Sequence, residues 1–183
     1  MRELIALILS IVVLLCLCSC DASYGSSSDG ILSESTGENK EWAPGYIEDD
    51  TYINEFAGIK FVKDDAWVFD KKLDANGKGP ALDMAADSAA INRVEVAFVQ
   101  AQSPINAEEC LRNMLEITPG WEFGAITERS FCGQKYFCVD GTLSVNRYRC
   151  YYRAINNYLV IINIFAVDVD ISEIEAMFCK IKA

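Results

Sequence analysis

The sequence contains no histidine, and this absence excludes several kinds of chemistry. Histidine is the side chain whose ordinary pKa lies nearest neutrality, so acid–base catalysis by imidazole is excluded. Ser-His-Asp and Cys-His nucleophile systems and zinc sites with histidine ligands are excluded with it. The sequence also lacks a C-x-x-C motif, a G-x-S-x-G motif and a P-loop. We therefore expect no redox, serine-hydrolase or nucleotide site built on these motifs.

Basic residues are also scarce. The chain has 16 Lys and Arg against 27 Asp and Glu, which gives a net charge of −11 at neutral pH. Nucleic-acid binding depends on clustered Lys and Arg that neutralise phosphates, so we expect no nucleic-acid partner. Most of the acidic excess lies in residues 21–50, whereas residues 51–183 are close to balanced.

Residues 1–19 have the layout of an export signal. Arg2 and the amino terminus supply positive charge, and the stretch from Leu4 to Leu17 is apolar. Signal peptides carry an apolar region of this length, whereas a membrane-spanning helix needs about 20 residues. Two alternatives stay open, namely a retained membrane helix and ordinary secretion with cleavage after a small residue.

The apolar stretch ends in Leu17-Cys18-Ser19-Cys20. This segment resembles the lipobox of bacterial lipoproteins, which has an aliphatic residue at −3, a small residue at −1 and then cysteine. The resemblance implies that the Cys20 thiol receives a diacylglyceryl group and that Cys20 becomes the first residue after cleavage. Cys18 at −2 departs from the usual Ala, Ser or Thr. Cys16 and Cys18 are interpreted as apolar filler, because a free cysteine behaves as a small hydrophobic residue.

Residues 20–48 are rich in Ser, Gly, Asp and Glu and show no apolar periodicity. Such a segment cannot bury enough surface to offset its ordering entropy, so we predict an acidic flexible tether. Two acyl chains hold a protein stably on a bilayer, whereas one chain binds marginally. We therefore expect a monomer that is lipid-anchored to the cell membrane on its extracytoplasmic face.

Residues 49–183 predict a single α+β domain. One helix should begin at Asn106 and stop at Pro119-Gly120, and a final helix should be capped by Ser172, with Glu175 completing a capping box. The order of elements predicts an antiparallel sheet of about six strands covered by two or more helices. Val94, Val96 and Phe98 should share one face of their strand. The alternating pattern predicts strands over 52–57, 59–62, 67–69, 82–86, 93–100, 122–129, 134–143, 147–155 and 158–167.

Several short pieces of this domain resemble a known family. They are Gly58-Ile59-Lys60-Phe61 followed by Trp67-Val68-Phe69, then Asp83-Met84, Gly133-Gln134-Lys135-Tyr136 and Tyr151-Tyr152-Arg153. Together with the element order they look like the small lipoproteins of Gram-positive gut bacteria whose domain is similar to the PsbP/Mog-type α/β/α sandwich. The resemblance covers roughly residues 50–183. It implies a PsbP-like fold, a non-catalytic binding or accessory role, and no active site or cofactor.

The predicted domain carries an odd number of cysteines, so they cannot all pair. Cys138 and Cys150 would face each other in a hairpin centred at Ser144, at the about 4.5–5.5 Å spacing of cross-strand neighbours, which is within disulfide reach. The alternative, that both are buried free thiols, stays open. Cys110 and Cys179 lie on the apolar faces of predicted helices and are interpreted as core residues.

Arg147, Arg149 and Arg153 alternate with other residues along one predicted strand and share a face with Tyr151. Arginine binds carboxylates and phosphates well, so these three residues form a candidate anion-binding face. The alternative is a solvated face in which the arginines pair with neighbouring acids.

The tryptophans are further candidates, because an exposed indole can stack on a sugar or another flat ligand. Trp67 lies in an apolar strand and is interpreted as core, whereas Trp42 lies in the predicted tether and is the more exposed candidate. The segment from Asp168 to Ser172 imitates a calcium loop but has Glu173 at the sixth position, where glycine is required. We therefore expect no metal site.

These observations favour a lipid-anchored extracytoplasmic binding or accessory module that is not an enzyme. Its partner would be a protein, a wall polymer or a small solute, in addition to the membrane that holds the anchor. The alternative function is a carboxylate-dependent surface hydrolase. Such an enzyme would show two close carboxylates in a pocket, one of them with a raised pKa.

Overall fold

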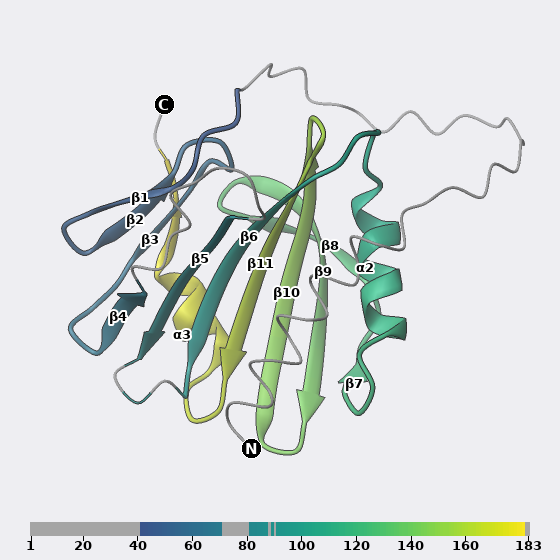
Figure 1. Ribbon diagram of the computed structural model, residues 1–183. Helices are drawn as coiled ribbons and strands as arrows, with labels where there is room; N and C mark the ends of the chain where they lie inside the picture. Colours follow the sequence, from purple (N-terminus) through teal and green to yellow (C-terminus); the bar gives the residue numbers. More distant parts are fainter. Residues whose placement is uncertain (1–40, 71–80, 88, 90, 182–183) are drawn as a thin grey trace, which may run out of the picture.

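The computed structural model describes residues 41–70, 81–87, 89 and 91–181 (Figure 1). The predicted signal segment 1–19, Cys20 and most of the predicted tether lie outside the described residues. Among the described helices, none is both long and apolar enough to cross a membrane.

Two antiparallel sheets make up the described fold (Figure 1). In the larger sheet the strand order is β4-β5-β6-β11-β10-β9-β7, and β8 also pairs with β9. Its strands are β4 (Trp67–Asp70), β5 (Ala81–Asp87), β6 (Arg93–Gln100), β7 (Glu122–Phe123), β8 (Thr127–Phe131), β9 (Gln134–Leu143), β10 (Asn146–Ile155) and β11 (Tyr158–Ala166). The smaller sheet has the order β1-β2-β3-β12, from β1 (Tyr46–Glu48), β2 (Thr51–Asn54), β3 (Ile59–Val62) and β12 (Phe178–Lys180).

The α+β class and the antiparallel pairing are confirmed, but the prediction of one sheet of about six strands is wrong. A second sheet forms because β12, at the C-terminal end of the described chain, adds to the edge of β3, with Phe178 opposite Phe61. The helices in the described part are α2 (Ala107–Glu116) and α3 (Ile171–Ala176). The larger sheet is therefore covered by α2 on one face and by the smaller sheet with α3 on the other, so one outer layer of the expected α/β/α sandwich is mostly strand.

Two hydrophobic cores lie on opposite faces of the larger sheet. The first core joins the larger sheet to the smaller sheet and α3, and it includes Val94, Val96, Phe98, Phe61 and Ile174. The predicted shared face of β6 is thus confirmed. The second core lies under α2 and includes Leu111 and Met114 of that helix together with Val139, Cys150 and Ile161. Strands in the middle of the larger sheet are buried on both faces, which explains their long apolar runs.

Helix α2 follows the sequence signals closely. The side chain of Asn106 accepts a hydrogen bond from the backbone N–H of Glu109 at 3.2 Å, as an N-cap does. Glu108 and Glu109 occupy the first turn, where negative charge favours the helix dipole. The predicted helix beginning at Asn106 is confirmed.

Helix α3 differs from its prediction at both ends. Asp170, not Ser172, is the N-cap, and Glu173 completes the capping box. The helix ends at Ala176, and Phe178 begins β12. The spacing of apolar residues around Phe178 is typical of a helix. In the structure Phe178 lies on β12, and its ring packs at 4.9 Å from the ring of Phe61 on the neighbouring strand β3. Cys179 therefore lies on a strand and not on a helix face.

Of the two alternatives for Cys138 and Cys150, the disulfide is wrong and the buried free thiols agree with the structure, because the hairpin register differs by one residue from the one that would pair them. Strands β9 and β10 are joined by the two residues Ser144 and Val145, so Cys150 lies opposite Val139 and Cys138 lies opposite Tyr151. Successive side chains point to opposite faces of a sheet, so this shift separates the two thiols. Cys138 belongs to the first core and Cys150 to the second, and both are free.

Two further boundaries differ from the sequence analysis. The strand expected over 122–129 is split into β7 and β8, and both parts pair with β9. The folded part begins earlier than residue 49, because β1 pairs with β2 and Trp42 packs against the first core. The turn at Asn156-Asn157 between β10 and β11 is confirmed, with Asn156 at a φ of 54°.

Candidate functional site

The candidate site lies along β10, between β9 and β11. Alternation along this strand places Arg147, Arg149 and Arg153 on the face that they share with Tyr151, which belongs to the first core. The three arginines therefore look toward the smaller sheet and α3. Their surroundings differ, and this difference decides what each of them can bind.

Arg149 is paired with two neighbouring acids. Its Nε donates to Asp140 of β9 at 2.5 Å, and its guanidinium contacts Glu175 of α3 at 2.8 Å. The Tyr151 hydroxyl also donates to Glu175. Burial opposes the ionisation of Asp140, but the hydrogen bond and charge of Arg149, with help from Arg129, outweigh it and lower the pKa of Asp140.

Arg147 is also paired. Its guanidinium lies 3.6 Å from the Asp170 carboxylate and donates to the backbone carbonyl of Val169. Arg147 and Arg149 thus fit the alternative interpretation, in which the arginines pair with neighbouring acids. They hold the start of α3 and its last turn against β10, and they do not form a free anion-binding face.

Arg153 has a different environment. Among the described residues no carboxylate lies within 4.0 Å of its guanidinium, which donates to the backbone carbonyl of Ala57 at 3.5 Å and interacts with the Tyr136 hydroxyl oxygen. Its Cζ lies over the ring of Tyr136, 5.8 Å from the centroid. Arg153 is partly exposed, so its positive charge faces both solvent and the end of the first core.

Two of the donors that are buried without a hydrogen-bond partner among the described residues belong to the first core or pack against it. They are the hydroxyl of Tyr136 and Nε1 of Trp42. Burial raises the pKa of Tyr136 to about 12, although the neighbouring Arg153 charge works in the opposite direction, so this hydroxyl keeps its proton at neutral pH. A buried donor without a partner is costly, and most such donors in folded proteins find an acceptor.

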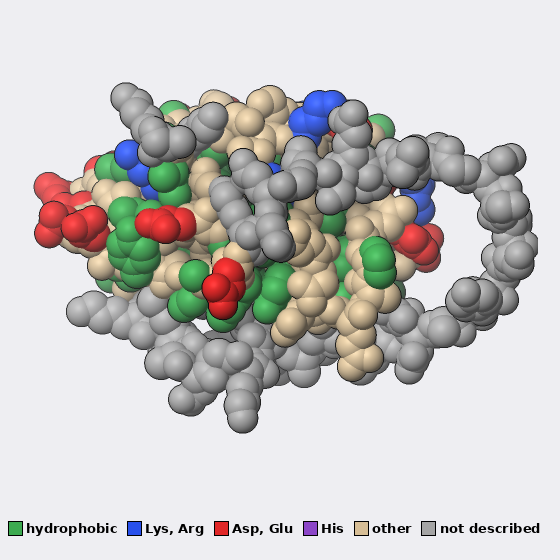
Figure 2. Space-filling model, turned by 90° about the horizontal axis from the view of Figure 1, so that it is seen from above, with side chains coloured by type: hydrophobic (Ala, Val, Ile, Leu, Met, Phe, Trp, Pro, Cys, Tyr) green, Lys and Arg blue, Asp and Glu red, His purple; other side chains and the backbone are tan. Residues whose placement is uncertain are grey.

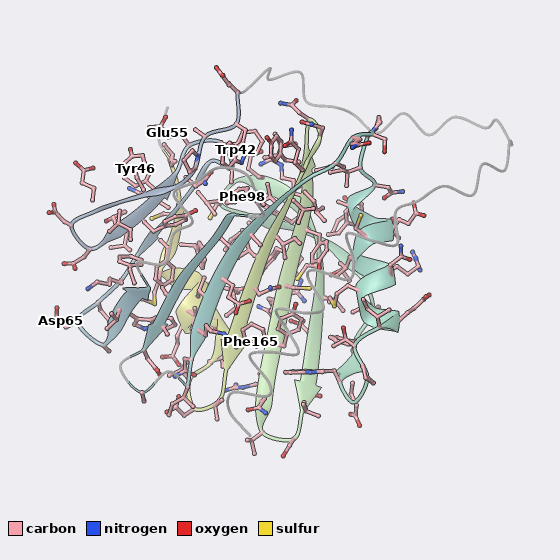
Figure 3. All side chains as sticks on the ribbon, viewed as in Figure 1. Trp42, Tyr46, Glu55, Asp65, Phe98 and Phe165 are labelled. Atoms are coloured by element: carbon pink, nitrogen blue, oxygen red, sulfur yellow. The ribbon has the colours of Figure 1, made fainter. Side chains whose placement is uncertain are left out.

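Trp42 reaches this end of the molecule by stacking. Its ring lies 5.7 Å from the ring of Tyr158 at an interplanar angle of 9°, and Phe56 also packs on Tyr158, in an edge contact with the ring centroids 5.4 Å apart. Figure 3 shows Trp42 at the same end of the sheets as the β10–β11 turn. The prediction that Trp42 sits exposed in a tether is therefore wrong, whereas Trp67 is a core residue as predicted.

The remaining sequence candidates have structural roles. Trp121 packs against Phe123 and Tyr148 over the second core. The Asp168 carboxylate accepts a hydrogen bond from Asn92 at 2.6 Å, at the end of β11. In the part of the chain that the structure describes, no group of three potential ligands is placed to hold a metal ion.

Acidic side chains gather at the end of the molecule formed by the turns of the smaller sheet (Figure 2). Asp49 and Asp50 lie in the turn between β1 and β2, and Asp64 and Asp65 lie in the turn before β4. Asp50 pairs with Lys63 at 2.7 Å, and Asp64 accepts from the backbone of Ala66. These four acids are therefore turn residues of the smaller sheet and of the connection to β4.

Sequence reasoning found Arg153 but missed Tyr136 as its neighbour. The β9–β10 ladder runs through Tyr152 opposite Phe137, so the next step along both strands brings Arg153 opposite Tyr136. The correct hairpin register would have found this pair. The sequence analysis selected Trp42 because an exposed indole can stack on a flat ligand. The residues around it in the sequence are polar, and none of them indicates that it packs on Tyr158.

No family model matches the chain, and no curated protein matches it at a significant level. Solved structures similar to it include the following two. The solution structure of cyanobacterial PsbP (CyanoP) from Synechocystis has 11% identity and a TM-score of 0.47, covering 72% of this chain and 91% of that chain. The crystal structure of LpqN, described as involved in cell envelope biogenesis of Mycobacterium tuberculosis, has 10% identity and a TM-score of 0.37, covering 65% and 76%. A PsbP protein is thus among the similar structures, at a level that assigns no residue role to this chain.

Proposed function

We propose that the protein is a membrane-anchored extracytoplasmic lipoprotein whose domain binds a ligand and catalyses no reaction. The observation that carries the binding role is the group of unmatched donors at the end of the first core. There a cation, Arg153, lies over the ring of Tyr136, and it meets no carboxylate among the described residues. The buried hydroxyl of Tyr136 has no hydrogen-bond acceptor among them. The anchor rests on the sequence Leu17-Cys18-Ser19-Cys20 after an apolar stretch.

The two carboxylates that contact Arg149 argue against the alternative function, a carboxylate-dependent hydrolase. Asp140 and Glu175 bind the same guanidinium, so they are a close pair, as carboxylate hydrolases require. A general acid in such a pair needs a raised pKa. Arg149 instead lowers the pKa of Asp140, because its effect outweighs that of burial. Asp140 therefore fits the role of an ionised structural partner of Arg149 better than that of a general acid.

The resemblance of the sequence to small lipoproteins of Gram-positive gut bacteria agrees with this proposal. In such an arrangement the acyl chains hold the protein on the membrane, and the acidic tether lets the domain reach a protein, a wall polymer or a small solute. The net charge of −11 favours neither nucleic acid nor anionic headgroups as the partner.

The anchor is tested by mass spectrometry of the native product in its bacterial host. We expect a chain that begins at Cys20 and carries a diacylglyceryl group, recovered in the membrane fraction. Cys20→Ala should abolish both features, whereas Cys18→Ala, the matched control two residues away, should keep them. A wild-type chain that still begins at Met1, or one cut without acyl groups, contradicts the proposal.

The binding role is tested by co-purification from detergent-solubilised membranes, with the wild type compared against Cys20→Ala. A partner that depends on the anchor should be recovered only with the wild type. Hydrolysis of wall polymer or ester substrates by the purified chain, lost in Asp140→Asn, would support the hydrolase alternative instead.

A further inference from the structure

We propose that residues 42–48 form an arm that two copies of the protein exchange, so that the arm of each copy packs on the body of the other. The arm runs from Trp42 through β1. The inference goes beyond the proposed ligand binding. It uses the proposed membrane anchor only as the reason why copies meet at high local concentration. The monomer expected from the sequence remains the form in dilute solution.

The arm is held to the body through few contacts. Trp42 stacks on Tyr158 with the ring centroids 5.7 Å apart, Ile47 packs against the first core, and the short strand β1 pairs with β2. Nε1 of Trp42 is buried without an acceptor among the described residues, so withdrawal of the indole costs no hydrogen bond to them. Segments with so little buried surface open more easily than core strands do.

The position of the arm in the fold allows it to leave. β1 is the outermost strand of the smaller sheet and pairs with β2 alone (Figure 1). An edge strand can detach without opening the sheet behind it, and the edge that it leaves can pair with another chain. A departed arm exposes the ring of Tyr158 and the edge of β2, which together we call the arm-binding surface. The arm of a second copy matches this surface in both its ring and its strand.

The turn between β1 and β2 can act as the hinge. It consists of Asp49 and Asp50, since Glu48 lies opposite Thr51. Asp49 has a φ of 51°, in the left-handed region that residues other than glycine adopt at a cost. Asp50 is fixed to the body, because its carboxylate pairs with Lys63 at 2.7 Å and its carbonyl accepts from the Lys63 N–H at 2.9 Å. Asp49 is therefore the pivot, and short strained turns of this kind favour exchange.

Exchange conserves the contacts of the arm, because each arm meets in the other copy the surface that it left in its own. The balance then depends on two terms. Straightening of the turn relieves the left-handed conformation of Asp49, whereas the loss of freedom on association opposes the dimer. Anchoring to a membrane raises the local concentration and reduces the second term. Residues 42–49 span about 26 Å when they are extended at about 3.3 Å per residue, which allows the arm to reach an adjacent copy.

The first test asks whether one copy accepts the arm of another. The full chain with Tyr158→Ser is labelled with ¹⁵N at tryptophan in detergent micelles, so that its Trp42 indole signal reports a released arm. Unlabelled chain with Trp42→Ala supplies a vacant arm-binding surface. We expect the Trp42 signal to move saturably to its wild-type position, while the signals of the other two tryptophans, Trp67 and Trp121, stay in place and show that the chain is folded.

The matched control for this mixture is unlabelled chain that carries both Trp42→Ala and Tyr158→Ser. It should leave the Trp42 signal unmoved, because its arm-binding surface lacks the ring on which the indole stacks. If Tyr158→Ser does not fold, Tyr158→Leu, which keeps apolar bulk without the ring, takes its place in both proteins.

The second test addresses the hinge through the dimer dissociation constant, measured for the full chain by sedimentation equilibrium in density-matched micelles. Asp49→Gly should raise this constant about tenfold or more, because glycine adopts the left-handed turn without strain and each dimer contains two hinges. Asp49→Pro should lower it, because proline fixes φ at about −65° and cannot form the turn.

Ser144→Gly is the matched control for the hinge. Ser144 has a φ of 57° and occupies the same place in the two-residue turn between β9 and β10, inside the larger sheet. This substitution relieves the same conformation in a turn that does not open, so it should leave the dissociation constant unchanged.

Three results would overturn arm exchange. They are a Trp42 signal that stays in place in the first mixture or moves equally with its control, a wild-type chain without a concentration-dependent dimer, and equal effects of Asp49→Gly and Ser144→Gly. Association through the amino-terminal apolar segment alone would appear as a dimer that is insensitive to residue 49. Neither test reads the lipid on Cys20 or partner recovery from membranes, so failure of arm exchange and failure of the proposed lipoprotein are distinguished.

Discussion

Arg149 connects three elements, since its guanidinium contacts β9 through Asp140 and α3 through Glu175 while its backbone belongs to β10. Arg149→Gln should lower the free energy of unfolding by about 1–3 kcal/mol, because two partly buried carboxylates lose a charged partner. Urea denaturation measures the change. Arg112→Gln is the comparison, because Arg112 pairs with Glu108 on an exposed helix face and such pairs contribute less than about 1 kcal/mol.

The same residue predicts a pH dependence. The pKa of Asp140 is lowered in the folded protein, so its contribution to stability is present above the unfolded value of about 3.9 and is lost as the pH falls through the lower folded value. The wild type should therefore lose more stability than Arg149→Gln between about pH 4 and pH 2. Urea midpoints measured across this range test the prediction, and parallel pH profiles for the two proteins contradict it.

The thiols of the domain should be slow to react. Burial raises the pKa of Cys132 to about 12 and that of Cys138 to about 11, and it also raises the pKa of the fully buried Cys150. Thiolate is the reactive form, so iodoacetamide at pH 8 should leave these three cysteines unmodified in the folded protein and modify them in urea.

Peptide mapping of the same samples without reductant tests the hairpin register. No peptide should contain Cys138 joined to Cys150, because the two side chains lie on opposite faces of the larger sheet. Recovery of that disulfide from the folded protein would mean that the register of β9 and β10 is shifted by one residue.

At the residue scale the sequence predicts side chains within one strand better than neighbours across strands. The shared face of Arg147, Arg149 and Arg153 follows from alternation alone. Which of them meets an acid depends on Asp140, Asp170 and Glu175, which come from other elements, and no single-strand pattern contains that information.

Among the elements, the sequence analysis misses two short strands, β1 in the predicted tether and β12 in the predicted final helix. β12 shows the reason most clearly. It has three residues, and its apolar positions continue the spacing of α3, so periodicity assigns it to the helix. By contrast, β6, β9, β11 and α2 are long or well capped, and their predicted ranges agree closely with the structure. The sequence analysis predicted one strand over 122–129 where the structure has β7 and β8. Gly124 is the single residue of that stretch that signals a break.

The short strand β12 should nevertheless contribute strongly to stability. The Phe178 ring packs at 4.9 Å from Phe61 and 5.0 Å from Phe131, and it is 7% exposed. Phe178→Ala should lower the free energy of unfolding by about 3–5 kcal/mol, as large cavities in cores do. Cys179→Ala, one residue away and partly exposed, should have a much smaller effect in the same urea titration.

For the whole molecule, the first core makes the two sheets dependent on each other. It contains Phe61 of the smaller sheet, Val96 and Ile162 of the larger sheet and Ile174 of α3. We therefore expect one cooperative unfolding transition, with coincident urea curves from tryptophan fluorescence and far-ultraviolet circular dichroism. A separate early transition in one signal would mean that the smaller sheet unfolds alone.

The pairing of β3 with β12 has a consequence for the order in which the protein can be completed. β3 is synthesised early, but the strand that fills its open edge follows β11 and α3 along the chain. Until that strand emerges from the ribosome, nascent protein keeps a row of unsatisfied backbone groups and an uncovered Phe61 ring. The pairing of the smaller sheet is therefore complete only after β12 has been synthesised, so the edge of β3 is filled late.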